Sequence, residues 1–292
     1  MSPINAFTVD VEDYFQVSAF EQHIARGQWG RYASRVVANT QRILRQLNRH
    51  DVQATFFVLG WVADRYPQLV RDIHQAGHEV GSHSYWHRLV YDLSPEEFRD
   101  DLRRSRDVLQ NLTGQPVIAY RAPSFSITKR SLWALDILTE EGFCVDSSVF
   151  PIHHDRYGIP GAKTSIHTLE TKSGQLWEFP PAVARFAGCN LPVSGGGYFR
   201  LYPFSLTRYC LNRLNRGRQE AFMFYVHPWE IDPEQPRLGV GSCLTRFRHY
   251  VNLSSTQRKL DALLGKFRFG RICDVIQQAE VSSLQEATEV PA

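Results

Sequence analysis

Apolar runs of strand length alternate with segments of helical period from residue 6 to about residue 150. Strands are predicted over residues 6–11, 54–59, 78–82, 117–120 and 143–145. Helices are predicted between them, over residues 36–47, 67–76, 94–114 and 128–141. This alternation favours an α/β fold in which parallel strands are joined by right-handed crossover helices.

Several helix ends are marked by capping residues. Ser34 can cap the first predicted helix, and Gly77 stops the second. Ser94-Pro95-Glu96-Glu97 is a capping box with proline at the first helical position.

The pattern loosens after residue 150. Residues 151–172 predict a long irregular insertion, and 194–198 a loop whose glycines permit a close backbone approach. Strands are predicted over 176–179 and 221–226, a helix over 254–267, and a polar tail over the last dozen residues. One domain with elaborated loops is the simplest interpretation.

The composition is that of a globular protein, with 43% hydrophobic and 22% charged residues among 292. A net charge of +3 gives no support to nucleic-acid binding. The five cysteines are scattered without a CxxC pair, which favours a reducing compartment. No signal peptide and no apolar run of roughly 18 residues are present, so we expect a cytoplasmic protein without a transmembrane segment.

Polar residues follow the predicted strands where those strands end. They are Asp10, His83, Arg121, Asp146 and His227. In parallel α/β folds, working residues gather at the carboxyl ends of the strands. This shared position predicts one functional site built from distant segments.

Two histidines and a group of carboxylates suggest a metal site. His83 and His87 are four residues apart, a spacing found where two imidazoles bind one metal. Alone, the pair could equally be ordinary loop residues. Asp10, Glu12 and Asp13 add carboxylates at the end of a buried strand, where like charges need a cation or an arginine. Two imidazoles and one carboxylate would leave a coordination position for water.

Three further residues have both a functional and an ordinary interpretation. Arg121, beside a stiff proline turn, suits a bidentate grip on a carboxylate, but could form a surface ion pair. Asp146 could simply make a turn. His227 follows a very apolar strand, which favours an acid or base over a packed core histidine.

Taken together, these residues resemble the polysaccharide deacetylases of carbohydrate esterase family 4, the NodB-homology group. The family's motifs are matched in order over roughly residues 6–230, by His83-Ser84-Tyr85-Trp86-His87, Arg121-Ala122-Pro123, Asp146 and Val226-His227. The segments 10–15, 194–200 and 227–230 resemble a subgroup associated with exosortase and exopolysaccharide loci. That subgroup carries an additional C-terminal region, which residues 230–275 match.

One position departs from the family pattern. The usual first motif has two adjacent Asp residues, the first a base and the second a metal ligand. Here Val11 takes the second place, so the ligand is either Glu12 or Asp13. Strand alternation favours Glu12, whereas an early strand end would favour Asp13.

The resemblance implies a distorted (β/α) barrel with fewer than eight strands and a single divalent metal, zinc or else Co2+, Ni2+ or Mn2+. It implies a barrel over residues 1–230, a C-terminal extension over 231–280 that packs on it, and a flexible tail over 281–292. His83, His87 and the carboxylate would hold the metal, and Asp10, fixed by Arg121, would act as base. A backbone N–H near Ser124 or Phe125 would stabilise the oxyanion. His227, steadied by Asp146, would protonate the leaving amine.

The implied reaction removes acetyl groups from N-acetylhexosamine units of a polysaccharide during exopolysaccharide biosynthesis or modification. The aromatic residues expected to stack on sugars are Trp86, Phe125, Tyr198 and Trp229. A membrane-bound polysaccharide assembly machinery is a possible partner. Two alternatives stay open: a related hydrolase of a non-sugar amide such as a cyclic ureide, and a catalytically silent glycan-binding component.

Overall fold

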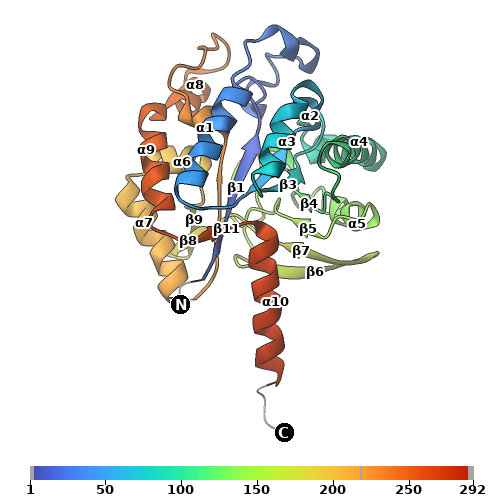
Figure 1. The fold of residues 1–292 in the computed structure, drawn as a ribbon, viewed down its shortest axis with the longest axis vertical. Coiled ribbons are helices and arrows are strands. Elements are labelled where there is room, and N and C mark those ends of the chain that lie inside the picture. Colours follow the sequence, from blue (N-terminus) through green and yellow to red (C-terminus); the bar gives the residue numbers. More distant parts are fainter. Residues whose placement is uncertain (1–2, 218, 289–292) are drawn as a thin grey trace.

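A curled, mostly parallel sheet forms the centre of the computed structural model, which describes residues 3–217 and 219–288 (Figure 1). Its strand order is β10-β1-β2-β3-β4-β5-β7-β6, and the short β11 pairs with the beginning of β1. The strands are β1 (Asn5–Val11), β2 (Thr55–Val58), β3 (Glu79–Ser82), β4 (Ala119–Tyr120), β5 (Val145–Asp146), β6 (His167–Thr171), β7 (Gly174–Glu178), β10 (Met223–Val226) and β11 (Phe269–Gly270).

The predicted distorted barrel is confirmed. The strands from β10 to β7 run parallel and form an incomplete barrel, because the edge strands β10 and β6 are not joined in the sheet order. The whole sheet holds nine strands, since the antiparallel hairpin strand β6 and the two-residue β11 add to this parallel core.

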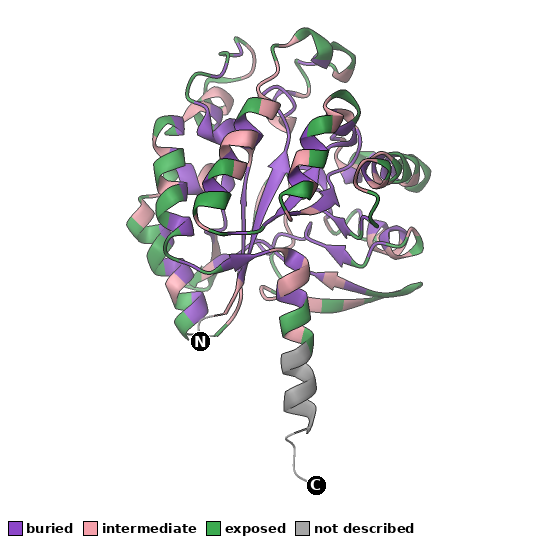
Figure 2. Ribbon diagram, viewed as in Figure 1, coloured by how far each residue is buried: buried purple, intermediate pink, exposed green. Residues whose placement is uncertain are grey.

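Helices α1 to α5 follow the strands and cover the outer side of the sheet, and further helices come from the second half of the chain. The helices are α1 (Val36–Arg49), α2 (Gly60–Arg65), α3 (Pro67–Gln75), α4 (Pro95–Thr113), α5 (Trp133–Glu140), α6 (Gly196–Leu201), α7 (Phe204–Asn212), α8 (Cys243–Tyr250), α9 (Leu253–Leu264) and α10 (Ile272–Thr288). Figure 2 shows the central strands buried, the edge hairpin of β6 and β7 partly exposed, and buried and exposed positions mixed along the helices. In α1, for example, Val36, Ile43 and Leu47 are buried, as the apolar periodicity predicts.

The helix ends agree with the sequence at α4 and differ at α1. Ser94 and Glu97 form the predicted capping box, and Gly114 closes α4 in the left-handed conformation. Ser34 does not cap α1. The Asp13 carboxylate instead accepts the Arg35 and Val36 N–H groups at 2.9 and 3.2 Å, and the Ser34 hydroxyl donates to the same oxygen. A carboxylate is a stronger acceptor than a hydroxyl at the positive end of a helix.

The second half of the chain contains elements that its sequence did not predict. The 151–172 region, predicted to be irregular, ends in β6, which forms a hairpin with β7. A separate two-stranded sheet consists of β8 (Val183–Phe186) and β9 (Cys189–Pro192). The glycine-rich loop packs against β10, because Gly195 leaves no room for a Cβ, which would lie 1.8 Å from the Tyr225 carbonyl oxygen.

The residues after 230 add α8, α9, β11 and α10. In Figure 1, α8 lies near the end of the sheet toward which β1 points, and α10 extends from the opposite end. The expected tail over 281–292 begins within α10, whose backbone is described to Thr288, and residues 289–292 lie outside the described residues. Among the described helices, none combines the length and apolar character needed to cross a membrane.

Candidate active site

Three of the five strand-end residues, Asp10, His83 and His227, line one cavity of about 240 Å3, and Arg121 pairs with Asp10 beside it. The cavity lies where β1, β3 and β10 end, as their parallel arrangement predicts. The residues of the first motifs that line it are Asp10, Glu12, His83 and His87, and the last motif contributes His227. Residues of the second half of the chain form much of the rest: His154, Arg156, Tyr157, Gly196, Gly197, Arg200, Tyr225, Trp229, Glu230, Thr245, Arg248 and His249.

Glu12, His83 and His87 form a buried group with the geometry of a metal site. One potential ligand atom from each lies within 4.8 Å of the others. The Glu12 Oε2 atom is 2.7 Å from His87 Nε2, yet this buried oxygen has no properly oriented hydrogen bond. Two atoms that share a cation adopt such a close, non-hydrogen-bonded arrangement, so these residues fit a divalent metal.

Neighbouring groups orient two of the three side chains. The His83 Nδ1 atom lies 2.8 Å from the Arg121 carbonyl oxygen, which leaves Nε2 free to face the cluster. The Trp229 indole N–H donates to Glu12 Oε1 at 3.1 Å. These contacts fix the ring of His83 and the carboxylate of Glu12 before any ligand arrives.

Asp101 of α4 holds the loop that carries both histidines. Its carboxylate accepts the Ser84 hydroxyl at 2.6 Å, the Tyr85 N–H at 2.7 Å and the Trp86 N–H at 3.1 Å. This anchor supports a strained turn, since Ser84 and His87 both have positive φ angles, 69° and 53°. The sequence offered no signal for Asp101, which reads as an ordinary residue of a polar helix.

The pKa shifts favour the metal-binding forms of two members of the cluster. Burial raises the pKa of Glu12, but the three neighbouring histidines outweigh it and lower the pKa to about 2. Burial lowers the pKa of His83 to about 4. Glu12 is therefore ionised and His83 neutral near pH 7, the forms in which both bind metals.

Asp13 lies outside this cluster. Its carboxylate faces the beginning of α1, where it accepts the hydrogen bonds described above, and burial raises its pKa. Of the two carboxylates that the sequence left open, the structure brings Glu12, and not Asp13, to the histidines. The physical reason is that Asp10 and Glu12 lie on the same side of the chain, and Asp13 on the other.

Asp10 and Arg121 form a buried ion pair beside the cluster. The Arg121 Nη1 atom is 2.6 Å from Asp10 Oδ1, and the whole guanidinium is fully buried. Arg121 also donates to the Thr8 hydroxyl and to Ser147, and its charged group lies 4.2 Å from the centre of the Phe57 ring. This set of contacts leaves the second oxygen of Asp10 facing the cavity.

His227 is held by Glu230. Glu230 Oε2 lies 3.1 Å from His227 Nδ1 and accepts the His227 backbone N–H at 3.0 Å, while the Arg200 guanidinium contacts the other oxygen at 2.8 Å. The His227 Nε2 atom faces Asp10 Oδ2 at 3.8 Å and Glu12 Oε1 at 3.7 Å. Burial lowers the pKa of His227, but these carboxylates together raise it to about 9.

Asp146 is placed away from His227, contrary to the expectation that it steadies this residue. It lies in register with Glu178 of β7, so the two fully buried carboxyl groups meet on one face of neighbouring strands. Burial raises the pKa of both groups, and Ser148 donates to Asp146. Glu230, and not Asp146, occupies the place beside His227.

Two of the four expected aromatic residues line the cavity. Phe125 and Trp229 do so. Trp86 instead packs against Trp29 and Tyr85, and Tyr198 against Tyr202, outside the lining. Tyr157, which the sequence did not single out, lies on the cavity wall and stacks on His154 with ring centres 3.8 Å apart.

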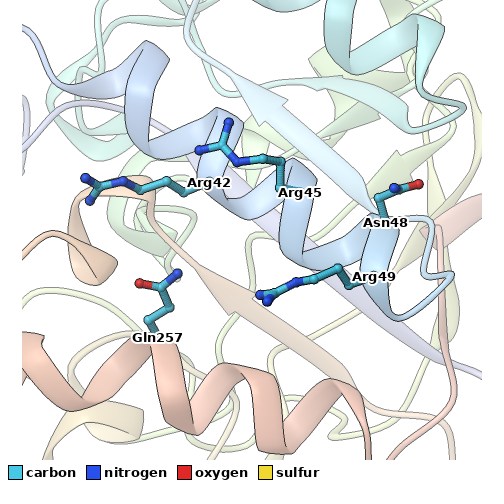
Figure 3. Close-up of a pocket in the computed structure, with 5 residues that line it drawn as sticks. All are labelled: Arg42, Arg45, Asn48, Arg49 and Gln257. Carbon is cyan, nitrogen blue, oxygen red and sulfur yellow. The ribbon is translucent and has the colours of Figure 1, made fainter.

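A second groove, of about 420 Å3, lies between α1 and α9 (Figure 3). It is lined by Arg42, Arg45, Asn48, Arg49 and Gln257. Two of its arginines are near carboxylates, Arg42 at 3.9 Å from Asp232 and Arg49 at 3.6 Å from Asp261. Its lining offers neither an acid nor a base for hydrolysis, so the chemistry is assigned to the cavity at the strand ends.

Comparison with protein families gives two adjoining matches. Residues 31–139 match the model described as polysaccharide deacetylase, and residues 147–277 match a domain of unknown function, DUF3473. The first covers both metal-site histidines and Arg121. The second covers most of the cavity wall together with His227 and Glu230.

Curated relatives match part of the chain. A peptidoglycan-N-acetylglucosamine deacetylase of Bacillus cereus is 34% identical over 107 residues, which are 36% of this chain and 38% of that protein. A peptidoglycan deacetylase of Helicobacter pylori is 28% identical over 135 residues, 45% of each chain. The chain thus spans less than half the length of these relatives.

Two solved structures share the fold along nearly the whole chain. A crystal structure described as a polysaccharide deacetylase from Mycobacterium smegmatis has a TM-score of 0.60 and 21% identity, and covers 99% of this chain and 92% of that one. The Puue allantoinase has a TM-score of 0.61 and 14% identity, with 94% and 89% covered. At this level of identity the likeness shows the fold alone. The fold does not tell whether the substrate is an amide on a sugar or an amide of another compound. The family match rests on sequence: the chain carries a polysaccharide deacetylase domain, of the NodB-homology group of carbohydrate esterase family 4, over residues 31–139, followed by a DUF3473 region over residues 147–277.

Proposed function

We propose that this protein is a metal-dependent hydrolase that removes N-acetyl groups from N-acetylhexosamine units of a polysaccharide. The observation that carries the proposal is the meeting of three kinds of group in one cavity. A buried Glu12–His83–His87 cluster lies beside the Asp10–Arg121 pair and beside His227. The relatives named for deacetylation of peptidoglycan support the acetylated glycan as substrate.

Glu12, His83 and His87 would hold the metal, with zinc as the expected ion because two imidazoles and a carboxylate are common zinc ligands. When bound, the metal supplies a Lewis acid that lowers the pKa of water and polarises the acetyl oxygen. The remaining steps belong to residues of this chain.

Asp10 acts as the general base. Its Oδ1 atom is held by Arg121, so Oδ2 remains to accept a proton from the water that attacks the acetamido carbonyl. The complete burial of Arg121 keeps the Asp10 carboxylate in one orientation, which a reaction of fixed geometry requires.

His227 acts as the general acid. Because Glu230 engages Nδ1, the Nε2 atom is directed to the cavity and can donate its proton to the amine as the C–N bond breaks. The products are acetate and a free hexosamine unit within the glycan.

The Ser124 backbone N–H is the proposed donor to the developing oxyanion. Of the two N–H groups considered, that of Phe125 already donates to the Ala122 carbonyl at 3.0 Å. Ser124 has a φ of 51° and lines the cavity, so its strained backbone directs this turn toward the reacting group.

The wider setting is also part of the proposal. We propose a role in exopolysaccharide biosynthesis or modification in the cytoplasm, with Phe125 and Trp229 stacking on sugar rings and a membrane-bound assembly machinery as partner. The segments 10–15, 194–200 and 227–230 motivate this setting through their resemblance to the exosortase-associated subgroup, which stays a prediction.

The test compares acetate release from an N-acetylglucosamine hexamer by the protein and its His227→Ala variant. We expect bound zinc in both and a loss of turnover of about 100-fold or more in the variant, the usual scale for a general acid. His74→Ala, on the outer helix α3, is the matched control and should retain activity. Equal turnover in the His227 variant would refute the assignment.

A further inference from the structure

Two arginines on the cavity wall have no carboxylate partner. Arg156 comes from the loop after β5, and Arg248 from α8. Both side chains are exposed, and in the described part of the chain neither guanidinium has an ion pair or hydrogen bond. By contrast, the exposed Arg103 and the partly exposed Arg99 share Glu141.

The two arginines act on the same stretch of wall. His154, which stacks on Tyr157 in the same lining, has its pKa lowered mainly by burial; Asp155 opposes this shift, and the positive charges of Arg248 and Arg156 add to it. The nearest acid, Asp155, is already engaged with His154 at 2.9 Å and is itself exposed. An acceptor for the guanidinium groups is therefore not supplied by this wall.

The cavity floor does not supply an acceptor for the two guanidinium groups either. Its carboxylates already have partners: Asp10 lies against Arg121, Glu12 against His87, and Glu230 against Arg200 and His227. The carboxylates of the floor are thus occupied, whereas the two guanidinium groups on the wall of the same cavity have no carboxylate partner among the described residues. A ligand that satisfies both regions has an acetamido group at the floor and an anionic group beside it.

We infer that the substrate is an acidic glycan, in which the sugar next to the reacting N-acetylhexosamine carries a carboxylate or similar anion that Arg156 and Arg248 bind. This inference rests on the proposed function of the same cavity. Guanidinium groups suit such anions because their N–H donors form paired hydrogen bonds with carboxylate and phosphate oxygens.

The inference also gives a role to the region matched by DUF3473. Arg156 and Arg248 both lie within residues 147–277, whereas the metal-site histidines lie in the deacetylase match. Thr245 and Arg248, three residues apart on one face of α8, both line the cavity. This region would then determine which glycan binds, while the residues of the deacetylase match carry the chemistry, as loops do on many α/β folds.

The test measures binding of a matched pair of oligosaccharides by calorimetry on the zinc-loaded protein. The pair is an N-acetylglucosamine hexamer and the same hexamer partly oxidised at C6, which adds carboxylates without changing the linkage. We expect the acidic hexamer to bind about tenfold more tightly. The ratio of the two affinities should fall about fivefold or more in the Arg156→Gln/Arg248→Gln double variant, and should shrink as salt is raised.

Arg246→Gln is the control, because Arg246 lies on the same helix but outside the cavity lining. Its affinity ratio should equal that of the unmodified protein. Equal affinity of the unsubstituted protein for the two hexamers would overturn the inference, and so would failure to bind either hexamer. An affinity ratio that stays the same in the double variant would also overturn it. Acetate release measured on the same samples reports the proposed function separately. Acid-selective binding without acetate would refute hydrolysis alone, and acetate release without selectivity would refute the acidic substrate alone.

Discussion

Glu230 lies 3.1 Å from His227 Nδ1, whereas Asp146, the carboxylate expected beside this histidine, is paired with Glu178. Glu230 is only three residues from His227 and is fixed by the buried Arg200. His227, the proposed general acid, is therefore oriented by a residue of its own turn, and Asp146 pairs instead with the neighbouring strand β7.

This arrangement predicts unequal effects of two isosteric substitutions. Glu230→Gln should lower kcat by about tenfold or more with little change in KM, because it weakens the orientation of His227 and not the binding of substrate. Asp146→Asn should have a smaller effect, since an amide can still hydrogen-bond to Glu178 and Ser148. Steady-state kinetics of acetate release by the two variants measures both effects. A larger loss of kcat in the Asp146 variant would contradict the assignment.

Substitutions of Glu12 and Asp13, the two other carboxylates of the first motif, should have different effects: one on metal binding and the other on stability. Glu12→Gln should lose bound zinc, because it removes a charged ligand. Asp13→Asn should keep zinc and lower the free energy of unfolding by about 1 kcal/mol, the usual value of a helix cap. Metal content and thermal unfolding of the two variants measure this. Zinc loss confined to the Asp13 variant would reverse the roles.

Asp101 should influence the metal without touching it. Replacement by Asn weakens three hydrogen bonds to residues 84–86, so zinc affinity should fall about tenfold to 100-fold, as for other residues that orient metal ligands. Asp100→Asn, at the exposed neighbouring position on α4, is the matched control. Competition with a chelator of known affinity gives both values. Equal zinc affinity in the two variants would show that the hydrogen bonds from Asp101 to residues 84–86 do not affect metal binding.

His78 predicts a pH dependence of stability outside the active site. Burial, aided by the charge of Arg271, lowers its pKa to about 4, and Nδ1 accepts the Ala54 N–H at 3.1 Å. The unfolded chain binds a proton near pH 6.5 and the folded protein only near pH 4. The neutral, buried His78 therefore contributes to the free energy of unfolding in full above pH 6.5. This contribution is lost as the pH falls toward 4, which lowers the free energy of unfolding by roughly 3 kcal/mol.

The measurement compares urea unfolding of the metal-free protein and its His78→Gln variant between pH 4 and 7.5. Gln can still accept the Ala54 N–H but does not titrate, so the variant should lose less stability on acidification. Parallel curves for the two proteins would contradict the buried neutral state of His78.

The sequence allowed much of the site to be predicted because of one geometric fact. Parallel strands bring their carboxyl ends together, so Asp10, His83, Arg121 and His227 could be assigned to one cavity from their positions after apolar runs. Whether Glu12 or Asp13 joins the two histidines depended on where β1 ends. The alternation of side chains along a strand does not fix that end. It is Val11 that ends the strand, and Glu12 that turns back toward the histidines.

Other features depended on strand order and loop packing, which periodicity does not report. The Asp146–Glu178 pair arises because β5 lies beside β7, with the intervening β6 displaced to the edge. Arg156 and Arg248 are nearly a hundred residues apart and lie in a loop and a short exposed helix, where no apolar pattern marks a shared surface. Asp101 gave no signal because an acid within a polar helix is usually solvated.

The central claim is tested most directly by acetate release from N-acetylglucosamine oligomers, using protein stripped of metal with a chelator and then assayed with and without added zinc. Release that requires zinc, and that is restored in proportion to the zinc bound, is the result predicted from Glu12, His83 and His87. Bound zinc with no acetate from oligomers or polymer, or full release without metal, would contradict the metal-dependent deacetylase.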